Sequence, residues 1–91
     1  MKIEVLFYTK QNCPLCEKAL AVVEQLQGEL SFELVIKDIS KDQALFDKYC
    51  FEIPVVAIDG KDLFKGRVSE KEFRAAIKSI SGGPISQEKR P

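Results

Sequence analysis

The chain has 91 residues, enough for one compact domain and too few for two. Of these residues 45% are hydrophobic and 31% are charged, an ordinary balance for a globular domain with its own core. Lysine plus arginine and aspartate plus glutamate both number 14, so the formal net charge is +0 and no single-sign field is expected to attract nucleic acid or an anionic membrane.

Residues 2–8 are predicted to form a strand at the centre of a sheet, because both faces are apolar. One face holds Ile3, Val5 and Phe7, and the other holds Leu6 and Tyr8. The apolar run of this segment is shorter than the about 7–15 residues of a signal-peptide core. No stretch approaches the roughly 18 apolar residues of a membrane span. We therefore expect a cytoplasmic protein with no membrane partner.

A helix is expected next, ending at Gly28. Asn12 is a favourable N-cap residue, and Pro14 is tolerated in a first helical turn. The apolar side chains that follow recur at helical spacing and form one stripe. The stripe consists of Cys16, Ala19, Leu20, Val23 and Leu26.

The next segments alternate between strand and helix patterns. Residues 31–37 are predicted to be a strand and residues 41–50 a short helix. The apolar positions that carry these patterns are Phe32, Leu34 and Ile36 in the strand and Leu45, Phe46 and Tyr49 in the helix. Pro54 then starts a third strand, and Asp59-Gly60 is a strong hairpin signal that leads into a short fourth strand.

The last helix is predicted to open at a capping box formed by Ser69 and Glu72. Its apolar face holds Phe73, Ala76, Ile77 and Ile80. Residues 82–91 begin with two glycines, which end the helix, and are expected to be a flexible tail outside a domain of residues 1–81.

The predicted order is β-α-β-α-β-β-α, an α/β fold. Because a helix joins the first two strands, they are expected to be parallel, with a right-handed crossover. The last two strands are expected to be an antiparallel hairpin. The result is a four-stranded mixed sheet with helices on its faces.

Cys13 and Cys16 form a C-x-x-C motif at the junction of the first strand and the first helix. At a helix N-terminus, unpaired backbone N–H groups and the helix dipole favour a thiolate at Cys13, and Lys10 adds positive charge nearby. Cys16 lies in the apolar stripe and is expected to be more buried. This asymmetry predicts disulfide exchange, in which Cys13 attacks a substrate disulfide and Cys16 resolves the mixed disulfide.

Two alternatives for the cysteine pair stay open. A structural zinc site needs four nitrogen or sulfur ligands, but the chain has no histidine and Cys50 is its remaining cysteine. An iron–sulfur cluster bridged between two subunits is the metal option that remains. The other alternative is a module for protein contact with idle cysteines. Cys50 itself is interpreted as a small buried hydrophobe or, alternatively, as an accessory thiol.

The stretches YTKQNCPLC and IPVVAIDGK, about forty residues apart, resemble the glutaredoxin branch of the thioredoxin fold. Within it, the chain is similar to small glutaredoxin-like proteins with a CPLC-type motif, over residues 2–80. The resemblance implies that Cys13 is the nucleophile and Cys16 the resolving thiol. It also implies a cis bond before Pro54, with the Ile53 backbone positioned to pair with a substrate peptide.

Other positions bear on the substrate. Lys10 matches the basic residue that precedes the motif in glutaredoxins. Leu15 stands where dithiol glutaredoxins carry an aromatic residue. Gly66 is a single glycine followed by Arg67, where they carry two glycines and an acidic residue. Arg67 is therefore a candidate to bind a carboxylate.

The resemblance implies a thiol–disulfide oxidoreductase with no bound cofactor and no metal. Its substrate is expected to be a disulfide-containing protein or a glutathione mixed disulfide. The electron donor is expected to be glutathione or a flavin-dependent thioredoxin reductase. A monomer is expected.

Overall fold

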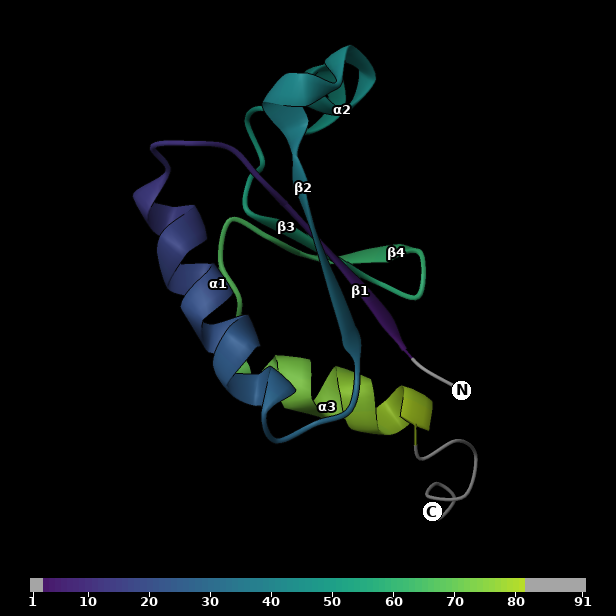
Figure 1. Cartoon of the computed structure of the whole chain (residues 1–91). Coiled ribbons are helices and arrows are strands. Elements are labelled where there is room, and N and C mark those ends of the chain that lie inside the picture. Colours follow the sequence, from purple (N-terminus) through teal and green to yellow (C-terminus); the bar gives the residue numbers. More distant parts are fainter. Residues whose placement is uncertain (1–2, 82–91) are drawn as a thin grey trace.

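The structure, a computed structural model, describes residues 3–81, and Figure 1 shows the arrangement of its elements. In chain order they are β1 (Glu4–Thr9), α1 (Pro14–Gln27), β2 (Glu33–Asp38), the 3-10 helix η1 (Ile39–Lys41), α2 (Gln43–Tyr49), β3 (Val55–Ile58), β4 (Lys61–Lys65) and α3 (Glu70–Ser81). The predicted order is confirmed, and η1 is an addition. The predicted helix stop and tail at residues 82–91 lie outside the described residues.

Within the described residues the strands form one four-stranded sheet in the order β2-β1-β3-β4. β1 is parallel to β2, as its helical connection predicted, and β3 is antiparallel to both β1 and β4. Asp59 and Gly60, which join β3 to β4, have φ values of 50° and 86°. Both lie in the left-handed region, as a tight hairpin turn requires, so this turn prediction is confirmed.

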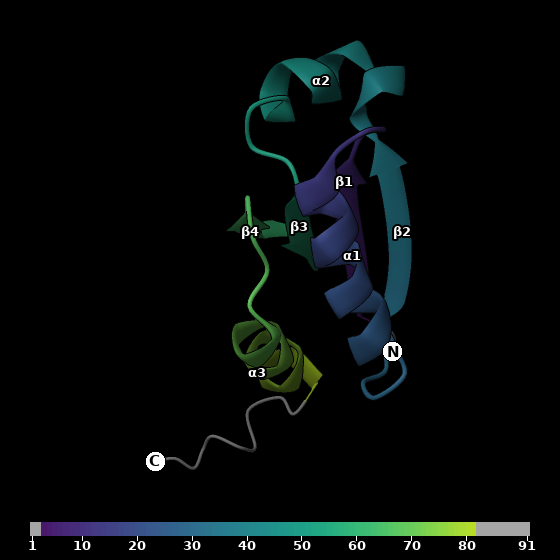
Figure 2. The same ribbon diagram turned by 90° about the vertical axis from the view of Figure 1, so that its left-hand side faces the viewer.

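Alternation along β1 creates two apolar layers, one on each face of the sheet. Val5 and Phe7 belong to a core cluster that also contains buried residues of α1 and α3. Tyr8 belongs to a second cluster, which contains Ile39 of η1 and Tyr49 of α2. Helices α1 and α3 therefore cover one face, and η1 and α2 pack against the other. Figures 1 and 2 show α2 at one end of the sheet and α3 at the opposite end.

Some local predictions need correction. Cys13, not Asn12, is the N-cap of α1, and Asn12 adopts a left-handed φ of 60° in the loop before it. Ile36, one of the alternating apolar positions that predicted this strand, is 48% exposed, because β2 is an edge strand. Ile80, expected on the buried face of α3, is 37% exposed.

The structure shows one of the two hydrogen bonds of the capping box predicted at the start of α3. The backbone N–H of Glu72 donates to the hydroxyl oxygen of Ser69 at 3.2 Å. Phe73 and Ile77 of this helix are almost fully buried against the first core cluster. The helix is thus held by a cap at its start and by two large apolar side chains on its inner face.

Candidate active site

Residues that are distant in the sequence meet where β1 ends. The register between β1 and β3 places Tyr8 opposite Val55, so Pro54 lies beside the end of β1 and the loop that leads to Cys13. The Ile53–Pro54 peptide bond is cis, as expected, and Pro54 is fully buried. The topology therefore places the cysteine loop and the Ile53–Pro54 segment side by side, at the end of β1 and the start of β3.

The two cysteines occupy the first turn of α1 and are joined in a disulfide, with their Cα atoms 5.2 Å apart. Cys13 has extended backbone angles, φ −123° and ψ 95°, and Pro14 is the first helical residue. The backbone N–H of Cys16 donates to the sulfur of Cys13 at 3.1 Å. This N–H is one of the donors that a helix N-terminus leaves without an intrahelical partner, and it points at the sulfur that would carry negative charge.

Burial distinguishes the two sulfurs as predicted. Cys13 is half-buried and packs at the edge of the first core cluster. Cys16 is 2% exposed and lies within that cluster together with Ala19 and Val23 of the same helix. A substrate therefore has access to Cys13 and not to Cys16.

The ammonium group of Lys10 lies over the Phe46 ring of α2, 5.8 Å from its centroid. This contact is a cation–π interaction. It lies near the end of β1, on the face of the sheet opposite to α1. Lys10 is exposed, so its side chain also contributes positive charge to the solvent around the loop. Its role in substrate binding remains a prediction.

Ile53 offers one of its two backbone groups to a partner. Its N–H donates to the carbonyl of Tyr49 at 3.1 Å. Within residues 3–81 its own carbonyl has no hydrogen-bond partner. If a substrate backbone pairs here, it does so through the Ile53 carbonyl.

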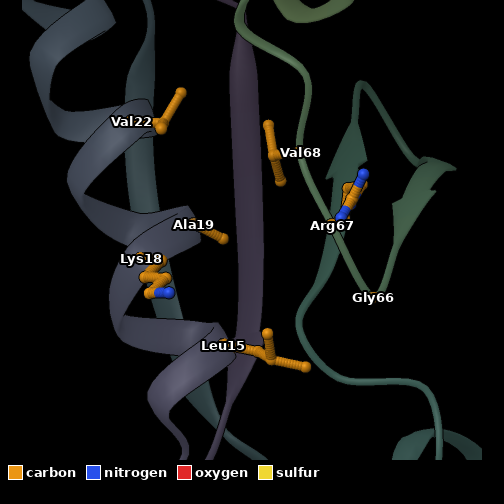
Figure 3. Close-up of a pocket in the computed structure, with 7 residues that line it drawn as sticks. All are labelled: Leu15, Lys18, Ala19, Val22, Gly66, Arg67 and Val68. Atoms are coloured by element: carbon orange, nitrogen blue, oxygen red, sulfur yellow. The ribbon is translucent and has the colours of Figure 1, made fainter.

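Leu15 and Arg67, both predicted to bind substrate, line the same groove, which has a volume of about 220 Å³. One wall is formed by α1, with Leu15, Lys18, Ala19 and Val22. The other wall is the loop of Gly66, Arg67 and Val68 between β4 and α3. In Figure 3, Leu15, Ala19 and Val22 project from α1 toward this loop. We call this cavity the Leu15 groove.

Lys18, Ala19, Val22 and Val68 were not predicted as site residues. A signal was available, because positions 15, 18, 19 and 22 share one face of a helix. The sequence pattern gave this helix one apolar stripe, and these four positions lie partly on its flank. The loop wall had no such signal, since only the tertiary structure places it opposite α1.

On the other face of the sheet, the side chains of α2 make packing and hydrogen-bond contacts within the fold. Tyr49 is buried, stacks on Tyr8 with ring centroids 4.4 Å apart, and donates to a carboxylate oxygen of Asp62 at 2.9 Å. Burial, reinforced by Asp62, raises the pKa of Tyr49 above its ordinary value. Cys50 is a free thiol that is half-buried at the C-cap of α2, less enclosed than the buried hydrophobe that was expected.

Within residues 3–81 no group of three or more histidine, cysteine, aspartate or glutamate side chains is arranged to hold a metal ion. Among the described helices, none has the length and apolar character needed to cross a membrane.

Solved structures share this fold. A protein of Nitrosomonas europaea, determined by NMR in solution, superimposes with a TM-score of 0.73 at 24% identity, over 85% of this chain and 93% of that one. A mutant thioredoxin of Halobacterium salinarum gives a TM-score of 0.69 at 22% identity, over 86% of this chain and 74% of that one. At these identities the similarity shows a thioredoxin-like fold and nothing further.

Curated relatives extend the comparison to sequence. A glutaredoxin-like protein of Dictyostelium discoideum is 28% identical over 93 residues, covering 96% of this chain and 86% of the relative. A probable thioredoxin of Methanothermobacter thermautotrophicus is 29% identical over 80 residues, covering 85% of this chain and 94% of the relative. Residues 4–78 match the family model for the glutaredoxin-like domain (DUF836). With its thioredoxin-like fold and its C-x-x-C pair at the start of α1, the chain belongs to this glutaredoxin-like family.

Proposed function

We propose that the protein is a thiol–disulfide oxidoreductase that cycles between a Cys13/Cys16 dithiol and the Cys13–Cys16 disulfide. The thioredoxin-like fold with a C-x-x-C pair supports a redox function in general. The observation that carries the specific proposal is the asymmetry of the pair. The Cys13 sulfur is accessible and accepts an N–H from the helix start at 3.1 Å, whereas Cys16 is buried directly behind it.

The first step is attack by the Cys13 thiolate on one sulfur of a substrate disulfide, R–S–S–R′. A Cys13–S–S–R bond forms, the S–S bond of the substrate breaks, and R′–S⁻ leaves and takes a proton from solvent. The backbone N–H of Cys16 and the N-terminal end of α1 favour the attacking thiolate over the thiol.

In the second step Cys16 loses its proton and attacks the sulfur of Cys13. The Cys13–Cys16 bond forms, the mixed disulfide breaks, and R–S⁻ leaves and is protonated. Two electrons have then passed from the dithiol to the substrate. The 5.2 Å separation of the two Cα atoms allows the sulfurs to bond without a change in the helix start.

The oxidised enzyme is then reduced by two thiols or by one dithiol. The donor is glutathione, which leaves as glutathione disulfide, or a flavin-dependent thioredoxin reductase. Proteins with disulfides or glutathione mixed disulfides are the proposed substrates. We propose that the protein acts in the cytoplasm as a monomer, without a bound cofactor.

The test is turnover of 2-hydroxyethyl disulfide, a small neutral substrate, with each donor supplied separately and coupled to NADPH oxidation. Wild type is expected to turn over with at least one donor. Cys13→Ser is expected to fall to the uncatalysed rate, while Cys50→Ser, which removes the other free thiol, retains wild-type turnover. The proposal fails if wild type is inactive with both donors or if Cys13→Ser remains active.

A further inference from the structure

The Leu15 groove begins at a residue between the two active-site cysteines. Leu15 is 58% exposed, although it is a large apolar side chain in the first turn of α1. An exposed apolar side chain next to a nucleophile is a typical contact for a partner that approaches the nucleophile. A substrate held at the Cys13 sulfur therefore has neighbouring residues within reach of this groove.

The walls of the groove combine apolar surface with positive charge. Ala19, Val22 and Val68 line it together with Leu15, and Lys18 and Arg67 stand on opposite walls (Figure 3). Both cations are exposed, and in the described part of the chain neither forms an ion pair. Within the same residues no carboxylate lines the groove. The groove thus has one exposed cation on each wall, and neither is paired with a carboxylate among residues 3–81.

The size of the groove limits its occupant. Its volume of about 220 Å³ lies below the roughly 300–1,000 Å³ of sites that enclose a whole small molecule. It is suited to one or two side chains of a peptide whose remainder lies outside. An apolar side chain would contact Leu15, Ala19, Val22 and Val68, and a carboxylate beside it would complement Lys18 and Arg67.

We propose that the Leu15 groove selects substrates, and that it prefers a peptide disulfide flanked by an apolar residue and an acidic residue. This inference rests on the thiol–disulfide exchange proposed above and names the substrate class for that reaction. Lys18 and Arg67 act as specificity-determining residues, and Cys13 and Cys16 perform the exchange as before. The contribution is electrostatic, so it weakens as salt screens the charges.

The test compares two peptides, each closed by an internal disulfide. They are identical except that Leu-Glu or Leu-Lys precedes the first cysteine. Wild type is expected to reduce the glutamate peptide with a kcat/KM about fivefold higher, the order expected for exposed charge pairs. This preference is expected to shrink in 0.5 M salt, where the Debye length is on the order of a few ångströms.

Variants assign the preference to the groove. Lys18→Glu/Arg67→Glu is expected to reverse it, and each single variant to reduce it. Lys61→Glu makes the same charge change as each single variant but at the far end of β4, outside the groove, and is expected to keep the wild-type preference. Equal rates for both peptides in wild type, or an unchanged preference in the double variant, would overturn the proposal.

Two further readouts separate the explanations. Turnover of 2-hydroxyethyl disulfide, which has no side chain for the groove, is expected to be the same in wild type and in Lys61→Glu. If wild type turns over 2-hydroxyethyl disulfide but shows no peptide preference, only the groove assignment is overturned. If wild type does not turn over 2-hydroxyethyl disulfide, the proposed function is overturned. If the double variant changes only the KM for glutathione as donor, the groove binds the donor and the peptide proposal is wrong.

Discussion

The backbone N–H of Gly66 donates a hydrogen bond to the carbonyl oxygen of Pro54 at 2.8 Å. This bond joins the loop after β4 to the segment that lies beside the cysteine loop. It therefore positions Arg67, one wall of the Leu15 groove, relative to the active-site edge of the sheet. Gly66 makes this bond with a φ of +81°, a conformation that residues with a Cβ rarely adopt.

Gly66→Ala is expected to lower the free energy of unfolding by about 1–2 kcal/mol, because a Cβ disfavours a left-handed backbone. The cost is conformational, since a Cβ here would meet no other atom within 4 Å. The matched control is Gly28→Ala, at φ −73°, where the added Cβ makes an ordinary 3.5 Å contact with the carbonyl of Gln25. The control is expected to be neutral or slightly stabilising in urea unfolding. Equal losses in both variants would contradict this explanation.

Cys16→Ser is expected to stop the reaction after its first step. The accessible Cys13 still attacks, but the buried partner that resolves the mixed disulfide is absent. With a peptide disulfide as substrate, intact-mass spectrometry should show one peptide bound per protein molecule, and a reducing agent should release it. Cys13→Ser is expected to bind none. Accumulation of adduct on Cys13→Ser would show that Cys16 or Cys50 is the nucleophile.

Alkylation of reduced Cys13 is expected to depend on pH with a midpoint below that of an ordinary thiol, whose pKa is about 8.5. The physical cause is the start of α1, where the Cys16 N–H points at the Cys13 sulfur. Reaction rates with iodoacetamide, measured from pH 4 to 10 in the Cys16→Ser/Cys50→Ser background, give this midpoint directly. An unstructured peptide with the same CPLC motif is the control. If both share one midpoint, the helix start does not activate the thiol.

Phe73→Ala is expected to destabilise the domain by about 3–5 kcal/mol, a large part of the 5–15 kcal/mol that holds a typical domain folded. Phe73 is 0% exposed and contacts the rings of Phe32 and Phe64, with centroids 5.4 Å and 5.9 Å away. Ile80→Ala removes a partly exposed side chain from the same helix and is expected to cost about 1 kcal/mol or less. Urea denaturation followed by circular dichroism measures both, and a comparable loss in the two variants would be inconsistent with this core.

Tyr49→Phe is expected to change how stability depends on alkaline pH. Because burial raises the pKa of Tyr49, the unfolded chain releases this proton first once the pH exceeds about 10. The free energy of unfolding of wild type should therefore fall above that pH, by at most about 1.4 kcal/mol per pH unit from this group. The variant lacks this contribution and should show a shallower decline between pH 10 and 11.5.

At neutral pH the same variant loses the hydrogen bond to Asp62 and is expected to be less stable by about 1 kcal/mol. Urea titrations at pH 8, 10 and 11 separate this constant loss from the pH-dependent one. Parallel pH profiles for the two proteins would mean that Tyr49 ionises alike in the folded and unfolded chains.

Local patterns in the sequence were enough to predict the order of the elements and the unequal burial of the two cysteines. Three of these patterns depend on neighbouring residues alone. They are the apolar alternation on both faces of β1, the helical stripe that contains Cys16, and the Asp59-Gly60 turn. Burial of Cys16 followed from its place in that stripe. These predictions succeeded because period and turn chemistry are properties of short segments.

The predictions that failed were those that depend on the position of an element in the fold. Ile36 continues the apolar alternation of its strand, but β2 is an edge strand of the sheet and Ile36 is exposed. The N-cap of α1 is Cys13 and not Asn12, because the loop before α1 places the Cys13 sulfur within hydrogen-bond distance of the Cys16 N–H.

Only the tertiary structure reveals the Leu15 groove. Leu15 and Arg67 are more than fifty positions apart, and nothing in either segment indicates that they share a cavity. They meet because β3 pairs antiparallel to β1 and the Gly66–Pro54 hydrogen bond holds the following loop against that edge. The sequence by itself thus determined where the C-x-x-C pair lies in the fold, whereas the packing of distant segments decided which surface lies beside it.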